Sequence, residues 1–224
     1  MISESTPLVQ EASLQRTRQA VRDEEPINAA THGLGCLLSG CGMLWLIAAY
    51  PGESPASLAV SLLFTSLLTL TYGVSALSHA VSAPRAKRLA RAWDQGVIYL
   101  LIVATYTPIL WRYVPTPVLE ITLVGIWLAA AVGFFAKVVY LWRIDDDFSP
   151  YSYVALGWVP ALALCYYVPW ECLRWIVLGG VIYSVGVCFL RLDKAVPYFH
   201  TVWHLPVIAA SACHFYAVYR FVLA

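Results

Sequence analysis

The chain has 224 residues, of which 60% are hydrophobic and 12% are charged, and its formal net charge is +1. Soluble domains carry about 25% charged residues, so the composition excludes an ordinary soluble domain. The near-neutral charge excludes a nucleic-acid-binding surface, and a mean hydropathy of +0.70 indicates that the lipid bilayer is the main solvent.

The polar segment at the start of the chain, residues 1–28, is expected to be a cytoplasmic tail. It contains Arg16, Arg18 and Arg22 among several acidic residues. It has no apolar core of the length found in signal peptides, so we expect no cleaved leader. Residues 29–224 are expected to form one membrane domain.

Seven apolar stretches approach the roughly 20 residues that a helix needs to cross the hydrocarbon core. They cover residues 31–50, 58–80, 95–113, 119–141, 152–168, 172–190 and 200–222. Turn-forming residues such as Pro51, Gly52 and Pro197 separate them. The sequence therefore predicts an all-α integral membrane protein built as a seven-transmembrane-helix bundle.

The basic residues predict how the bundle is oriented. All of the 14 Lys and Arg except Arg112, Arg174 and Arg220 fall in the tail or in alternate connections on the same side as the tail. Cytoplasmic loops carry an excess of Lys and Arg. We therefore expect a cytoplasmic N-terminus and an outside C-terminus, with the bacterial inner membrane as the location.

Five polar residues fall near the expected cytoplasmic ends of three spans. Ser75 and His79 lie near the end of the second, Asp94 begins the third, and His200 and His204 begin the seventh. Ionisable groups at membrane depth are energetically costly, so each is a functional hypothesis. The orientation predicted from charge brings all five to one depth.

The spacing of these histidines favours a metal site. Residues four apart share one face of a helix, as His200 and His204 do. With His79 they provide three imidazoles, and three neutral imidazoles plus water form a catalytic type of zinc site with one open position. Asp94 could orient that water or accept its proton. The alternative is that these histidines only anchor helix ends or form hydrogen bonds.

Two further histidines are assigned to other roles. His214 follows His204 by ten residues, about 15 Å along a helix, so it cannot share the metal, and we expect an interhelical hydrogen bond. His32 begins the first span at a suitable depth. We expect it to cap the helix or to support a ligand, with direct ligation as the alternative.

Several stretches of the chain, taken together, resemble the hemolysin III family, which belongs with the progestin and adipoQ receptors. The matching motifs are Ser75-x-x-x-His79, Asp94 with the stretch that runs to Pro108, and His200-x-x-x-His204; further stretches are Asn28 to Gly33, Gly179 to Gly186 and Cys213 to Val218. The resemblance implies a seven-helix fold with the N-terminus inside and Zn²⁺ on His79, His200 and His204. It also implies that Asp94 contacts a zinc-bound water, with Ser75 beside it.

The sequence departs from the family pattern at Ser78, where Tyr is frequent, at Gln95, where His is frequent, and at Pro206, where Phe is frequent. None of these departures removes an expected metal ligand. They bear on local geometry and on substrate preference.

Three functions compete. The related alkaline ceramidases suggest a zinc-dependent hydrolase of membrane lipid amides or esters, with Asp94 as general base and Ser75 as a hydrogen-bonding group. A non-enzymatic homeostasis or sensor protein with structural zinc is the alternative. A pore-forming cytolysin, which the family name suggests, is disfavoured because no secretion signal is visible.

Overall fold

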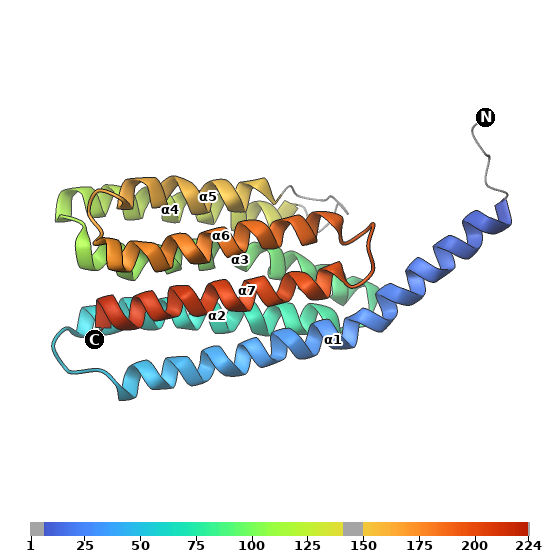
Figure 1. Ribbon diagram of the computed structural model, residues 1–224, viewed down its shortest axis with the longest axis horizontal. Helices are drawn as coiled ribbons and strands as arrows, with labels where there is room; N and C mark the ends of the chain where they lie inside the picture. The colour runs from blue at the N-terminus through green and yellow to red at the C-terminus, as the bar shows by residue number, and fades with distance from the viewer. Residues whose placement is uncertain (1–6, 141–149, 224) are drawn as a thin grey trace.

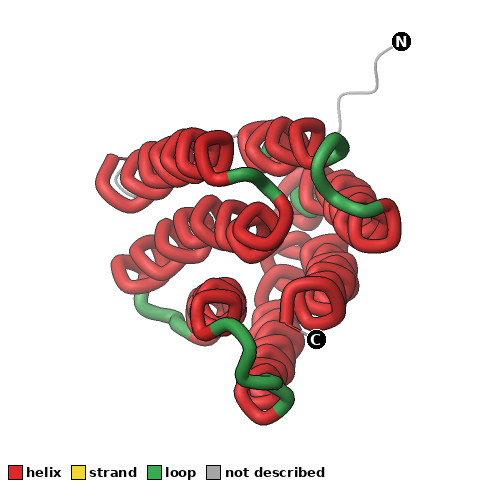
Figure 2. The backbone as a smooth tube through the Cα atoms, turned by 90° about the vertical axis from the view of Figure 1, so that its left-hand side faces the viewer, coloured by secondary structure: helices red, strands yellow, loops and turns green. Residues whose placement is uncertain are grey.

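The computed structural model describes residues 7–140 and 150–223, with side chains from residue 23 onward, and every element in these ranges is helical (Figure 2). The helices are α1 (Pro7–Ala48), α2 (Pro55–Ala80), α3 (Pro84–Tyr113), α4 (Thr116–Phe135), α5 (Tyr151–Leu164), α6 (Trp170–Leu192) and α7 (Phe199–Val218). Two short π-helical segments, η1 (Ala136–Tyr140) and η3 (Tyr219–Leu223), continue α4 and α7.

Within the described ranges, six helices are long and apolar enough to cross a membrane, so the chain is a multi-pass integral membrane protein. The exception is α5, which is shorter than the expected span over residues 152–168. It has 14 residues, about 21 Å at 1.5 Å per residue, against a hydrocarbon core of about 30 Å. It ends at Leu164, where the chain turns toward Pro169. The seventh crossing and the orientation remain predictions.

Two helices begin earlier than the apolar pattern indicates. Helix α1 begins at Pro7 rather than near residue 31, and its first part projects away from the bundle (Figure 1). Helix α3 begins at Pro84 rather than at residue 95, with the proline in the first turn, where its missing N–H costs nothing. Hydropathy marks where lipid begins, whereas helical hydrogen bonding continues into the polar region. Residue 141, the expected end of the fourth span, lies outside the described residues.

The interior is built mainly around α3. Buried side chains occur along most of its membrane-spanning part, whereas α4 buries only Leu119 and Ala130. The main hydrophobic cluster joins residues of α2, α3, α6 and α7, among them Phe64, Ile109 and Ile176. Helix α1 packs against α2 and α7, and α4 packs against α3.

The ends of the described chain lie at opposite ends of the bundle (Figure 1). The α2–α3 and α6–α7 connections lie at the end where α1 enters the bundle. This end therefore receives the last turn of α2, the first turns of α3 and the first turns of α7. These are the three segments that carry the predicted site.

Candidate metal centre

Three histidines from two helices converge at this end of the bundle. His79 comes from the last turn of α2, and His200 and His204 come from the first two turns of α7. Their candidate ligand nitrogens all lie within 4.8 Å of one another. His204 is only 1% exposed and His79 is also buried, while His200 is half-buried. The structure thus brings together the three residues that the sequence singled out.

The other ring nitrogen of each histidine is held by a neighbouring side chain. His79 Nδ1 lies 2.7 Å from Glu25 Oε2, and His200 Nδ1 lies 2.9 Å from Asp193 Oδ2. An ionised carboxylate only accepts hydrogen bonds, so in both neutral rings Nδ1 carries the hydrogen. The lone pair of each ring is therefore on Nε2.

A hydroxyl group can hold His204 in the same tautomer. Its Nδ1 lies 2.8 Å from Thr31 Oγ1, and Thr31 donates its own hydrogen to the carbonyl oxygen of Asn28 at 3.0 Å. Since a hydroxyl has one hydrogen, a Thr31 that donates to the Asn28 carbonyl accepts from His204 Nδ1. In this arrangement Nε2 carries the lone pair in all three imidazoles.

This donor set fits Zn²⁺. Metal-binding histidines usually donate their second nitrogen to a carboxylate, carbonyl or water, and such partners fix the ring and its tautomer. His79 Nε2 is enclosed and has no hydrogen-bond partner among the described residues, so it needs a group to bind. A cation at about 2.0–2.1 Å from each nitrogen would draw the three together.

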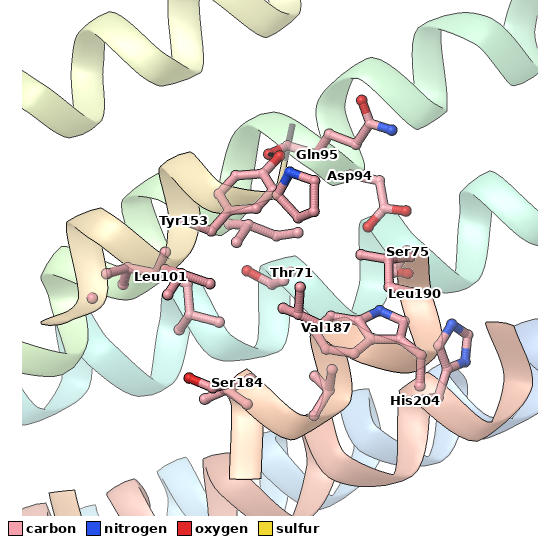
Figure 3. A pocket seen from close by; sticks show the side chains of 18 of the residues that line it. Thr71, Ser75, Asp94, Gln95, Leu101, Tyr153, Ser184, Val187, Leu190 and His204 are labelled. Carbon is pink, nitrogen blue, oxygen red and sulfur yellow. Dashed lines mark hydrogen bonds between the residues drawn. The ribbon is translucent and has the colours of Figure 1, made fainter. Parts of the chain in front are cut away.

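Asp94 and Ser75 lie beside the histidines. Within the described residues, the Asp94 carboxylate does not join the group of mutually close ligand atoms. It accepts a hydrogen bond of 3.1 Å from Ser78 Oγ and is directed toward Ser75 (Figure 3). Ser75 Oγ lies 2.7 Å from His32 Nδ1. Whether Asp94 and Ser75 take part in catalysis remains a prediction.

His32 supports the centre instead of capping a helix, because α1 runs through it without interruption. Its ring stacks on that of His204 at a centroid distance of 3.5 Å. Its Nε2 is enclosed and has no partner in the described part of the chain. His32 therefore holds Ser75 on one edge and offers a free polar atom on the other.

Sequence reasoning missed the partners of the ligands. Glu25 falls in the expected tail, residues 1–28, and Asp193 falls between the expected spans over residues 172–190 and 200–222. Glu25 also binds Lys87 Nζ at 2.6 Å and Arg91 at 3.4 Å, so one carboxylate joins α1, α2 and α3. The three- and four-residue spacing of Glu25, Asn28 and His32 is a helix-face signal that could have placed them together.

A cavity of about 610 Å³ extends from the histidines into the bundle (Figure 3). The end of the cavity at the metal centre is polar and includes the three histidines, Asp94 and Ser75. Deeper in the bundle its wall is mostly apolar and is formed by α3, α5, α6 and α7, with residues such as Leu101, Ala161, Ile176, Val187 and Val207. This shape can hold a hydrocarbon chain whose polar end meets the metal centre.

The family model described as Haemolysin-III related matches residues 21–215. The chain belongs to the hemolysin III family. Hemolysin-3 of Bacillus cereus is 34% identical to it over 205 residues, which cover 89% of this chain and 92% of the relative. The hemolysin-3 homolog of Bacillus subtilis (strain 168) is 32% identical over 200 residues, covering 87% and 92%.

A mammalian protein also resembles this hemolysin III protein. The human monocyte to macrophage differentiation factor is 32% identical over 131 residues, which cover 57% of this chain and 53% of the human protein. No solved structure matches the chain. The comparisons confirm the resemblance stated from the motifs.

Proposed function

We propose that this hemolysin III protein is a zinc-dependent hydrolase of a membrane lipid amide or ester in a bacterial inner membrane. The observation that carries the proposal is the convergence of three histidine ring nitrogens at the polar end of a largely apolar cavity. In this proposal His79, His200 and His204 hold the zinc.

Different residues would carry out the separate steps of the hydrolysis. Bound zinc would supply Lewis acidity for a water molecule and for the acyl carbonyl. Asp94, held by Ser78 at 3.1 Å, would accept the proton of the attacking water and return it to the leaving amine or alcohol. When His32 donates to Ser75 through Nδ1, Ser75 would give its own hydrogen to the Asp94 carboxylate and hold that carboxylate in place. The apolar wall would hold the acyl chain and exclude water.

A structural zinc site is the second candidate. Structural sites are closed by four protein ligands. Among the described residues, the group of mutually close ligand atoms contains three histidines and no fourth residue. This favours the site with an open position, and so favours the hydrolase over the structural clamp.

Metal content and lipid turnover test the proposal together. The purified protein, reconstituted with zinc, is expected to hold one zinc per chain and to release fatty acid from at least one member of a panel of ceramides and glycerolipids. His204→Ala should lose the metal. Asp94→Asn should keep the metal and lower turnover by about 10²–10⁴-fold, the range of general acid–base catalysis. His214→Phe is the control for metal content, because it alters a buried histidine outside the ligand group.

The outcomes separate the candidates. Full zinc content in His204→Ala would show that the ligand set is wrong. Stoichiometric zinc without turnover of any lipid in the panel would overturn the hydrolase and support the structural site. Asp94→Asn with undiminished turnover would remove Asp94 from the mechanism.

A further inference from the structure

His214 lies far from the metal centre and has no place in the proposed chemistry. It is buried on α7, ten residues after His204, and it lines the same cavity. Ten residues of helix correspond to about 15 Å. The expected interhelical hydrogen bond is confirmed, since its Nε2 lies 3.1 Å from the carbonyl oxygen of Ile176 on α6.

This hydrogen bond fixes the tautomer of His214. A carbonyl oxygen only accepts, so Nε2 carries the hydrogen and Nδ1 of the neutral ring is an acceptor. Nδ1 has no hydrogen-bond partner among the described residues and is not among their enclosed, unpartnered atoms. The cavity therefore reaches it.

The ring is also fixed in position. A Cβ atom added at Gly179 would lie 2.3 Å from His214 Nε2, so the imidazole packs directly against the backbone of α6. The absence of a side chain at Gly179 makes this approach possible. Because the ring cannot move, His214 Nδ1 can accept a hydrogen bond only from a ligand group at one position in the cavity.

Several other polar side chains along the cavity wall are already engaged. Thr71, Thr105 and Ser184 donate their hydroxyl hydrogens to the carbonyl oxygens of Leu67, Leu101 and Gly180 in their own helices. The hydroxyl of Tyr183 is paired with Ser211 at 2.7 Å. Unlike these side chains, His214 keeps Nδ1 without a protein donor, so this nitrogen can accept a hydrogen bond from a ligand in the cavity.

We propose that His214 Nδ1 forms a second polar subsite, which accepts a hydrogen bond from a hydroxyl group in the middle of a lipid chain. The proposal rests on the lipid cavity of the proposed function and names a substrate class, a lipid with a hydroxylated acyl chain. The polar end of the chain lies at the histidines of the metal centre, and the hydroxyl lies about 15 Å deeper, beside His214.

Oleic acid and ricinoleic acid test the subsite, because they differ by one mid-chain hydroxyl. Their affinities for the purified, zinc-loaded protein can be measured by displacement of a fluorescent fatty acid. Ricinoleic acid is expected to bind about threefold to tenfold more tightly, the ratio given by one net hydrogen bond. In His214→Phe, oleic acid should bind as before and the preference should disappear. Oleic acid hydroxylated beside its carboxyl group is the positional control, and its affinity relative to oleic acid should not depend on His214.

Equal affinities of the two acids for the wild type would overturn the subsite, and this arm requires no variant to fold. A preference that survives in His214→Phe would overturn it as well. Hydrolysis is measured separately, so the two proposals can fail independently. A ricinoleic acid preference in a protein without turnover would support the subsite and leave only the hydrolase overturned.

Discussion

Thr31 contacts His204, the most buried of the three histidines, through a single hydroxyl group. That hydroxyl accepts from His204 and donates to the Asn28 carbonyl. Thr31→Val keeps the shape and removes both bonds, so we expect zinc affinity to fall by about tenfold, the lower range for losing a partner of a metal ligand. Competition with a chromogenic chelator measures this.

Thr69→Val is the matched control, because the Thr69 hydroxyl bonds only to the Thr65 carbonyl of its own helix. It should leave zinc affinity unchanged. Equal affinities in wild type and Thr31→Val would mean that Thr31 does not set the His204 tautomer.

At this scale the sequence predicted that the three histidines lie together but did not predict their hydrogen-bond partners. His79, His200 and His204 could be grouped because helical spacing and charge asymmetry are both visible in one dimension. Glu25 and Asp193 could not, because an acidic residue in a polar segment looks like a solvated charge. Their contacts with histidines depend on how separate helices pack.

Besides the Thr31–His204 contact, two polar contacts bind helix α1 to the first turn of α7. Glu24 Oε1 accepts from the backbone N–H of Tyr198 at 2.6 Å, and Asn28 Oδ1 accepts from Thr201 Oγ1 at 2.6 Å. Tyr198 has a φ of 64°, a left-handed conformation that is unfavourable for a bulky residue and must be held by its surroundings. These contacts position the turn of α7 that carries His200.

We expect Asn28→Ala to weaken this junction between α1 and α7. Loss of the Thr201 bond should cost about 1 kcal/mol, which lowers the unfolding temperature by about 2–4 °C for a chain of this size. Thermal unfolding in detergent measures the shift. Ser39→Ala is the control on the same helix, because the Ser39 hydroxyl donates to Cys36 within α1. Equal shifts in the two variants would contradict a role for the junction.

At the scale of elements, apolar runs located the helices but misplaced several of their ends. The stretch over residues 58–80 became α2 almost unchanged. The starts of α1 and α3 were missed because both helices continue through polar sequence, where hydropathy gives no signal. The expected fifth span was too long at its end, because its run of apolar residues continues past Leu164 into a turn.

The direction of the whole molecule in the membrane is still to be measured. The two ends of the described chain lie at opposite ends of the bundle (Figure 1), and the basic residues predict that the N-terminus is cytoplasmic. Alkaline phosphatase fused to the C-terminus should therefore be active in a bacterial cell. The same enzyme inserted after Ala83, between α2 and α3, should be inactive. The reverse pattern would invert the predicted orientation and place the metal centre on the outer side.

At the scale of the whole molecule, composition predicted a membrane protein, the distribution of basic residues predicted its orientation in the membrane, and the motifs indicated its family. They did not predict a cavity that continues beyond the metal centre to His214. Its volume depends on how α3, α5, α6 and α7 pack around it, and the spacing of residues along the chain does not contain this information.

The contrast between α3 and α4 has a consequence for how sequences of this fold can diverge. Helix α4 exposes Ile121, Val124, Leu128 and Val132 and buries two residues. A side chain that faces lipid needs only to be apolar, so Leu, Ile, Val and Phe can replace one another at these positions. Along α3, nearly every turn in the membrane meets another helix or the cavity. Mutations should therefore accumulate on α4 and be removed on α3, so that two neighbouring helices change at very different rates.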